Sequence, residues 1–262
     1  MSLRAGARIA LVSCGAALVL AAAATVAVHA PRATGPEAFH PVFAEQTDLV
    51  TNEYAHRHPS ADGAVSSSDW IVTSGSLFSR DGAGWTGVPD GADPNARSGN
   101  GTGSAVFRAI SRRADFSDTR VDFDLHLLGF VTTSRTPAHD WDGVHVFLRY
   151  HNDAELYVVS IRRRDGTLAI KKKTPGGPVN GGTYTTLAET AAPAGTGPMM
   201  HVSTTVRNRP DGSVALSAAI DGITVLRAID MGEHGHTIRD AGRVGLRGDN
   251  CEFTFRDFRA EG

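Results

Sequence analysis

The residues best suited to chemistry lie on three consecutive predicted strands between residues 143 and 173. Apolar side chains occupy alternate positions in these strands, and alternate side chains of a strand point to opposite faces of a sheet. If the apolar set faces the core, the opposite face presents His145, Arg149, Arg162, Lys171 and Lys173. Guanidinium and ammonium groups bind carboxylates, so this face predicts a site for an anionic ligand such as a uronate-containing glycan. The alternative is a solvated polar face whose charges pair with nearby Asp and Glu.

Two tryptophans are candidates for stacking on a sugar ring. Trp141 stands between Asp140 and Asp142, so the ring could stack while the carboxylates accept hydrogen bonds from hydroxyl groups. Trp85, in a Gly-Trp-Thr-Gly sequence, is a second candidate of the same kind. The alternative for Trp141 is a cap on the core, followed by a turn at Asp142. We expect both tryptophans to contribute to substrate binding.

Two routes of bond cleavage are compatible with these residues. Asp140 and Asp142 are the best carboxylate pair for glycoside hydrolysis, which needs one acid and one base or nucleophile. A uronate lyase needs instead a cation that neutralises the carboxylate and a base that removes the neighbouring proton. The candidates for that route are His145, Tyr150, Tyr157, Arg149 and Lys171. The sequence leaves open whether the protein is an enzyme.

Oxygen ligands near the end of the chain suggest one structural calcium ion, because calcium is held by carboxylate and amide oxygens. The candidates are Asp249, Asn250 and Asp257, joined by Asp115 or Asp118. The chain has only 2 Cys, which excludes a disulfide framework and any multi-cysteine metal site.

The elements that must position these residues are short strands separated by turn signals. Residues 120–128 alternate apolar and polar side chains throughout. Asp165-Gly166 and Pro210-Asp211-Gly212 mark tight turns between neighbouring strands. No window of helical length shows a persuasive 3.6-residue period. The pattern predicts an all-β protein built as an antiparallel β-sandwich.

Four stretches resemble the concanavalin A-like jelly roll, the sandwich of laminin G-like lectin domains and many glycan-active enzymes. They lie at residues 70–77, 114–125, 144–161 and 242–258. The chain is also similar to the bacterial domain of 3-keto-disaccharide hydrolase type, which has the same sandwich. The resemblance implies a single domain in which one concave sheet holds the sugar chain, and a structural calcium ion that joins the terminal strands.

Two activity motifs of that fold are missing. Its retaining glucanases carry a Glu-x-Asp-x-x-Glu strand, and its alginate lyases carry a Gln-aliphatic-His strand. Neither string occurs in this sequence. The resemblance therefore implies a fold and a class of ligand but no particular reaction.

The N-terminal segment indicates export. Arg4 and Arg8 precede an apolar run at residues 9–28, and Ala30 offers a small residue for cleavage. We expect a signal peptide at residues 1–30, a linker at 31–45 and the sandwich domain at 46–262. The alternative is an uncleaved segment that anchors the protein in a membrane, because the run approaches the length of a membrane span.

These observations predict a secreted bacterial protein that binds an extracellular polysaccharide on its concave sheet, and the basic residues expected there favour an anionic one. The alternative is a carbohydrate-active enzyme, a uronate-polysaccharide lyase or a glycoside hydrolase, that uses the same groove. The formal net charge of −2 argues against nucleic acid as a partner, and we expect no membrane contact beyond the signal peptide. One feature runs against that mean charge: all three lysines of the chain are consecutive, at Lys171, Lys172 and Lys173.

Overall fold

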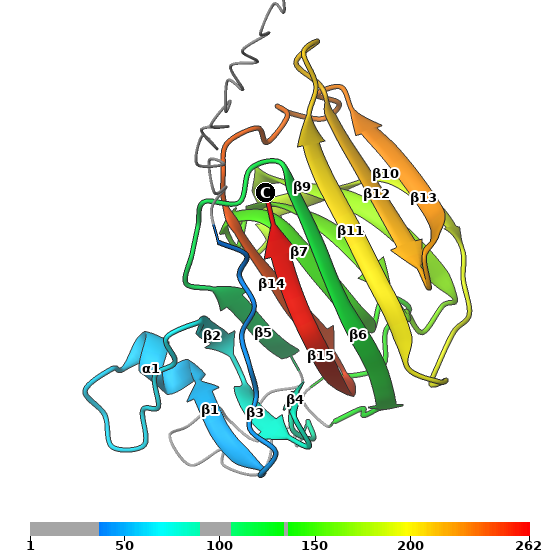
Figure 1. Cartoon of the computed structure of the whole chain (residues 1–262). Coiled ribbons are helices and arrows are strands. Elements are labelled where there is room, and N and C mark those ends of the chain that lie inside the picture. Colours follow the sequence, from blue (N-terminus) through cyan, green and yellow to red (C-terminus); the bar gives the residue numbers. More distant parts are fainter. Residues whose placement is uncertain (1–36, 90–105, 134–135) are drawn as a thin grey trace, which may run out of the picture. The chain divides into compact units, whose positions relative to one another are not determined.

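The computed structural model describes residues 37–89, 106–133 and 136–262, so the expected signal peptide lies outside the described residues. Two antiparallel sheets contain the described strands (Figure 1). One sheet has eight strands in the order β1-β3-β4-β15-β6-β11-β12-β13, and the other has seven in the order β10-β9-β8-β7-β14-β5-β2. The antiparallel β-sandwich expected from the sequence and from its resemblance to concanavalin A-like jelly rolls is confirmed.

The strands of the eight-stranded sheet are β1 (Asp48–Asn52), β3 (Ser76–Arg80), β4 (Ala83–Trp85), β6 (Thr119–Phe130), β11 (Met200–Asn208), β12 (Val214–Ile220), β13 (Ile223–Asp230) and β15 (Cys251–Glu261). Those of the seven-stranded sheet are β2 (Trp70–Ser74), β5 (Val106–Ser111), β7 (Gly143–Asn152), β8 (Glu155–Ile161), β9 (Thr167–Val179), β10 (Gly182–Ala191) and β14 (Arg243–Asp249). A short helix, α1 (Glu53–Arg57), follows β1.

The core lies between the two sheets and is built from alternate residues of their strands. Val144 and Val146 of β7 are fully buried, as are Val121 and Phe123 of β6. Because side chains alternate across a strand, the residues between these positions face outward. Aromatic rings fill the rest of the core, mostly in edge-to-face contacts such as that between Trp70 and Phe258, with ring centroids 5.1 Å apart.

The chain before β1 is packed on the sandwich from Phe39 onward. Phe39 forms a β-bridge with Ala260, and Phe43 lies edge-on against Phe255 at 5.2 Å. Both phenylalanines are buried. The described part of the segment expected as a linker therefore contributes to the core.

A bulge in β7 determines which side chains reach the outer face of the seven-stranded sheet. Arg149 has a φ of 48°, and the pairing of β7 with both neighbouring strands shifts register around it. An extra residue in a bulge resets the alternation of a strand. As a result Leu148 and Arg149 are both buried, while Tyr150 stacks on Phe147 with ring centroids 5.6 Å apart.

A buried ion pair joins the edge strand β13 of one sheet to β9, the second strand from the edge of the other. Nζ of Lys172 on β9 lies 2.8 Å from Oδ1 of Asp230 on β13, and both side chains are 0% exposed. The hydroxyl of Tyr157 donates to the other carboxylate oxygen at 2.6 Å. This cluster places one of the three consecutive lysines in the interior. Among the described residues, no helix has the length and hydropathy that a membrane span requires.

Candidate functional site

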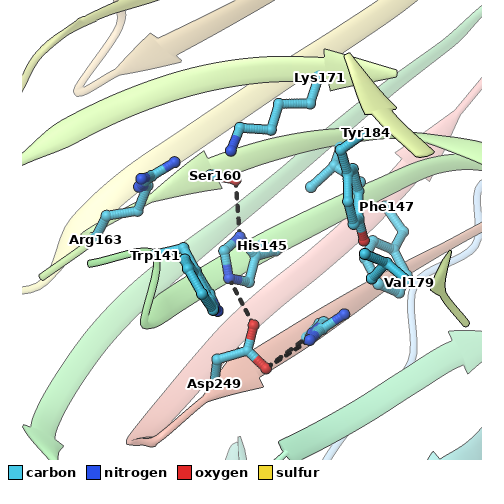
Figure 2. Close-up of a pocket in the computed structure, with 11 residues that line it drawn as sticks. Trp141, His145, Phe147, Ser160, Arg163, Lys171, Val179, Tyr184 and Asp249 are labelled. Carbon is cyan, nitrogen blue, oxygen red and sulfur yellow. Dashed lines mark hydrogen bonds and ion pairs between the residues drawn. The ribbon is translucent and has the colours of Figure 1, made fainter. Parts of the chain in front are cut away.

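A cavity of about 400 Å³ opens on the outer face of the seven-stranded sheet (Figure 2). Its floor comes from β7, β8 and β14, and its walls come from β9 and the hairpin that β9 forms with β10. Trp141 and Arg163 line it from the loops that precede β7 and follow β8. Residues far apart in the sequence therefore meet here because their strands are neighbours in one sheet.

Three side chains on neighbouring strands form a chain of contacts across the floor. Nδ1 of His145 lies 2.8 Å from Oγ of Ser160, its direct partner in the pairing of β7 with β8. Nε2 of His145 lies 3.1 Å from Oδ2 of Asp249 on β14, a close contact that lacks the geometry of a hydrogen bond. All three residues are buried, with 2–6% of their surface exposed, and all three line the cavity.

Burial and neighbouring charges determine the protonation states of His145 and Asp249 on the cavity floor. Burial lowers the pKa of His145, so its imidazole is neutral near pH 7. Burial by itself would raise the pKa of Asp249, but the nearby Arg247 and His145 outweigh it and hold that pKa far below its ordinary value. Arg247 donates to Oδ1 of Asp249 from Nε at 2.9 Å and contacts it from Nη2 at 2.8 Å. The carboxylate is thereby ionised and held in place.

The cations around the cavity differ in whether they have a partner. Arg163 is paired with Asp165 and Arg247 with Asp249. Lys171 is partly exposed, and within the described chain its ammonium makes no hydrogen bond or ion pair. Burial and the neighbouring Arg163 lower the pKa of Lys171. The cavity therefore holds a surplus of positive charge, carried by Lys171.

Aromatic and aliphatic side chains form the apolar part of the cavity. Trp141 is 50% exposed and is held by stacking on His139, with centroids 4.3 Å apart and planes 11° from parallel. Tyr184 stands on the opposite side, beside Phe147 and Val179 (Figure 2). Burial raises the pKa of Tyr184, so its hydroxyl stays protonated. An exposed indole facing a tyrosine across a partly charged cavity is an arrangement suited to a sugar ring.

A second hollow, of about 740 Å³, continues across the same sheet toward β5 and β2. It shares Arg247 with the cavity and is also lined by Arg108, Tyr150 and Asp153. Arg108 lies 2.6 Å from Asp153, and the hydroxyl of Tyr150 donates to the same carboxylate at 2.5 Å. Together the two hollows form a path that crosses several strands.

The structure brings some of the predicted substrate-binding residues into the cavity. Trp141, His145 and Lys171 line it. Lys173 is on the same side of β9 but is buried, where its ammonium donates to the backbone oxygen of Asp153 and lies 4.9 Å from the ring centroid of Tyr184. Burial lowers the pKa of Lys173 to about 8. Lys173 thus lies under the β9–β10 hairpin and outside the cavity lining.

The structure does not bring Arg149 to this face, because the bulge turns it toward the interior. Its guanidinium donates to the backbone oxygens of Ser117 at 3.0 Å and Ile238 at 2.6 Å, and to Oδ1 of Asn208 at 2.8 Å. It also contacts Asp118 at 3.2 Å. Arg149 is 0% exposed, so it ties loops together and is unavailable to a ligand.

Arg162 and Trp85 also lie elsewhere. Arg162 has a φ of 49°, directs Nε to the sulfur of Met200 at 3.0 Å, and leaves the cavity to Arg163. Trp85 belongs to the other sheet, where its indole N–H donates to Glu252 at 2.9 Å. Strict alternation would place Arg162 on the cavity face, but the turn after β8 directs it elsewhere. Trp85 does not reach the cavity because it lies on the other sheet.

The two tyrosines proposed as bases are separated by the sheet. Tyr157 faces the core, is 0% exposed and is bonded to Asp230. Tyr150 faces outward into the second hollow. Burial and hydrogen bonding raise the pKa of both phenols well above the ordinary value, so neither serves as a base near neutral pH.

Asp140 and Asp142 do not form an acid–base pair. Asp142 is 1% exposed and accepts hydrogen bonds from Arg164 at 3.1 Å, from the backbone of His139 at 3.0 Å and from Asn250 at 3.1 Å. Asp140 is exposed on the loop. Because Asp142 is fully engaged in holding the loop that carries Trp141, the pair does not support glycoside hydrolysis.

The oxygen atoms proposed as calcium ligands do not converge. Asp115 pairs with Arg113, Asp118 binds Arg149 and the backbone N–H of Asn208, and Asp249 is held by Arg247. Asn250 donates to Pro137 and Asp142, and Asp257 is exposed on β15. No group of three or more His, Cys, Asp or Glu side chains in the described ranges is arranged to hold a metal ion. The residues present do not fit a calcium ion.

Several cavity residues were not singled out from the sequence: Phe147, Ser160, Arg163, Tyr184 and Arg247. Ser160 had a usable signal, since it alternates with the buried Val159 and Ile161 and must share a face with His145. The sequence contains no such signal for Arg163 or Tyr184. Arg163 reaches the cavity because of the turn with positive φ at Arg162, and Tyr184 reaches it because the β9–β10 hairpin folds back over the sheet.

Comparisons with known proteins give structural neighbours only. No protein-family model matches this sequence, and no curated protein matches it. The chain is similar to a carbohydrate-binding module, CBM66, from Bacillus subtilis, with 12% identity over 74% of this chain and 95% of that one, and a TM-score of 0.48. It is similar to an endo-1,3-beta-glucanase from Streptomyces sioyaensis, with 14% identity, coverages of 84% and 96%, and a TM-score of 0.45. It is also similar to the alginate lyase Aly36B, with 11% identity, coverages of 87% and 98%, and a TM-score of 0.46. With TM-scores below 0.5 these likenesses carry no argument about this chain, and its function has to be argued from the site itself.

Proposed function

We propose that this protein binds an acidic polysaccharide across the outer face of its seven-stranded sheet. The observation that carries the proposal is the cavity between Trp141 and Tyr184, which contains the unpaired ammonium of Lys171. The exposed indole offers a stacking surface for a sugar ring. The ammonium offers a partner for a carboxylate in a site partly shielded from water, where such a contact is stronger than on an open surface.

The charges of the site favour an anionic ligand over a neutral one. Arg163 and Arg247 are already neutralised by Asp165 and Asp249, so they add little net charge. Lys171 is left partly desolvated with no ion-pair partner, and burial lowers its pKa even though the more distant carboxylates of Asp165 and Glu189 attract its ammonium. A ligand carboxylate would supply the missing partner and relieve that cost.

The length of the binding surface favours a polymer. The second hollow shares Arg247 with the first and continues toward β5 and β2. A chain of sugar residues could therefore place one ring by Trp141 and further rings along the sheet. This arrangement supports a protein that recognises the interior of a polysaccharide.

We also propose that the protein acts outside the cell. The support is the sequence of the N-terminal segment, in which Arg4 and Arg8 precede the apolar run at residues 9–28. An uncleaved segment that anchors the domain to a membrane is the alternative, and mass determination of the protein recovered from a culture medium distinguishes the two.

A uronate lyase is the second candidate, because Lys171 and Tyr184 lie in one cavity with the neutral His145. Cleavage by β-elimination leaves an unsaturated sugar that absorbs in the ultraviolet. Incubation with alginate, polygalacturonate and hyaluronan therefore separates a lyase, which produces that absorbance, from a binding protein, which does not.

Affinity electrophoresis tests the proposed binding. Native gels containing alginate or polygalacturonate should retard the protein, and gels containing neutral dextran or laminarin should not. Lys171→Met should reduce the retardation strongly, since it removes the unpaired cation. Arg227→Met is the matched control, because Arg227 is exposed on β13 of the other sheet.

Two results would overturn the proposal. One is the absence of retardation by any acidic polysaccharide at low ionic strength, where charge contacts are least screened. The other is equal loss of retardation in Lys171→Met and Arg227→Met, which would show that net charge alone drives the binding.

A further inference from the structure

We propose that Ser160, His145 and Asp249 form a catalytic triad that hydrolyses an acyl ester on the bound glycan. The substrate class is an O-acylated acidic polysaccharide, so this inference rests on the proposed function for its natural substrate. It adds a reaction that neither glycan binding nor β-elimination includes. The inference stands on the contacts that join the three side chains on the floor of the cavity (Figure 2).

The geometry approaches the requirement that a nucleophile contacts a base which a carboxylate orients. The hydrogen bond to Ser160 is formed, whereas the contact to Asp249 is close but not aligned as a hydrogen bond. Catalytic hydrogen bonds often align only when the substrate binds. Oγ of Ser160 lies 2.8 Å from Nδ1 of His145, and Oδ2 of Asp249 lies 3.1 Å from Nε2 of the same ring. Arg247 fixes the carboxylate through its other oxygen. Each of the four residues lies on a strand of one sheet, which is a rigid support for a site.

The contacts also decide which imidazole nitrogen carries the proton. Asp249 is ionised and can only accept, so the neutral ring is most stable with its N–H at Nε2, facing that carboxylate. Nδ1 is then free to accept the hydroxyl proton of Ser160. The two nitrogens have the reverse assignment to that of the serine-protease triad, while the order carboxylate, imidazole, hydroxyl is the same.

The surroundings of Ser160 suit an ester. Ser160 lines the cavity, and its partner on β9 is Ala169, whose small side chain places no bulky or polar group beside the hydroxyl. Lys171 is the diagonal neighbour of Ser160 across the same strand pair, since Lys171 is opposite Val158. Its three N–H donors can hold a uronate carboxylate and also stabilise negative charge on the ester oxygen. Phe147 and Val179 provide an apolar wall for a short acyl group.

The reaction balances with water as the only co-reactant. Oγ of Ser160 attacks the ester carbonyl carbon while Nδ1 of His145 takes the hydroxyl proton. The tetrahedral intermediate expels the sugar oxygen, which receives that proton and leaves as an alcohol. Water then gives a proton to Nδ1 and attacks the acyl-serine. Collapse of the second intermediate returns the proton to Ser160 and releases a carboxylic acid.

Labelling and turnover test the triad without any glycan. A fluorophosphonate probe should react with the full-length protein, and mass spectrometry should locate the adduct on Ser160. 4-Nitrophenyl acetate should be hydrolysed, with a loss of roughly 10³-fold in Ser160→Ala and in His145→Gln. Ser217→Ala is the matched control, because Ser217 is a strand serine on the other sheet that bonds to Thr205. Circular dichroism shows that each variant is folded, and release of acetate from an acetylated uronate polymer tests the natural substrate class.

The outcomes separate the triad from the proposed binding. If polysaccharide binding is intact but Ser160 is unlabelled and 4-nitrophenyl acetate is not turned over, the triad is wrong and the three residues have a structural role. If hydrolysis depends on Ser160 and His145 while no acidic polysaccharide is bound, the triad holds and the proposed glycan ligand is wrong. Equal activity in Ser160→Ala, Ser217→Ala and the unaltered protein also overturns the triad.

Discussion

Two adjacent lysines on β9 show how differently one sheet uses the same side chain on its two faces. Lys172 points into the core, is 0% exposed and is paired with Asp230 at 2.8 Å. Lys171 points outward into the cavity, where no described side chain pairs with it. A buried charge needs a fixed partner, whereas a cation left without one at the edge of a cavity can accept a ligand.

Arg149 and Arg163 differ in the same way as Lys172 and Lys171. Arg149 is enclosed by acceptors on the core side, and Arg163 lies at the cavity with Asp165 as its partner. The surroundings of each cation, and not its residue type, therefore decide whether it is enclosed in the core or lies at the cavity.

The largest expected effect is the loss of stability when the buried pair is broken. Lys172→Met should destabilise the fold by about 3–5 kcal/mol, because it leaves Asp230 buried without its cation. Lys171→Met should change stability by no more than about 0.5 kcal/mol. Urea denaturation followed by fluorescence measures both. Equal effects in the two variants would contradict the assignment of the two lysines to different faces.

Arg149 and Arg163 should differ in the same direction. Arg149→Met removes hydrogen bonds from buried acceptors and should lower the free energy of unfolding by about 3 kcal/mol or more. Arg163→Met removes one pair with the exposed Asp165 and should cost about 1 kcal/mol. Thermal unfolding of both variants checks this. If the Arg149→Met protein were stable but bound glycan poorly, Arg149 would have to contact the ligand, which would contradict its assignment to the interior.

On the outer face, the expected effects are on affinity. Lys171→Met should weaken binding of an acidic oligosaccharide by about 10–100-fold, since a hydrogen bond to a charged group contributes about 1.5–3 kcal/mol. Trp141→Ala should weaken it by about 3–10-fold through lost stacking. Calorimetric titration gives both values, with Arg227→Met as the control. Unchanged affinity in both cavity variants would exclude the cavity as the binding site.

The smallest expected effect concerns Lys173, whose pKa burial lowers to about 8. The unfolded chain binds this proton more tightly than the fold does, so this group makes stability rise with pH from about 8 to about 10.5. Lys173→Met lacks that contribution. The difference in unfolding free energy between this variant and the unaltered protein should therefore change by on the order of 1–2 kcal/mol over that range, which is the full effect of the shift reduced by solvent screening of a partly buried group. A difference that is independent of pH would show that Lys173 is not desolvated.

Alternation in the sequence was sufficient to predict the sandwich and the outward direction of His145 and Lys171. The same rule also places Lys172 beside Leu168 and Ile170 on the core face, where the structure has it. Alternation failed at Arg149 and Arg162, because both adopt a positive φ: Arg149 forms a bulge within β7, and Arg162 lies in the turn directly after β8. Such a bulge requires no glycine and leaves no mark in the sequence pattern.

The chemical partners were harder to predict than the faces. Asp249 was expected as a calcium ligand. The sequence around this carboxylate gives no sign that its partners are Arg247 and His145. Only the pairing of β14 with β7 brings it to His145. The site depends on contacts between strands about 100 residues apart in sequence, and those contacts follow from sheet order.

A crystal structure with a bound uronate oligosaccharide would locate the ligand on the sandwich. We expect a sugar ring against Trp141 and a carboxylate within hydrogen-bond distance of Nζ of Lys171, with further rings following the second hollow toward β5. An oligosaccharide bound only on the eight-stranded sheet, or at the sheet edges away from Lys171, would contradict this expectation.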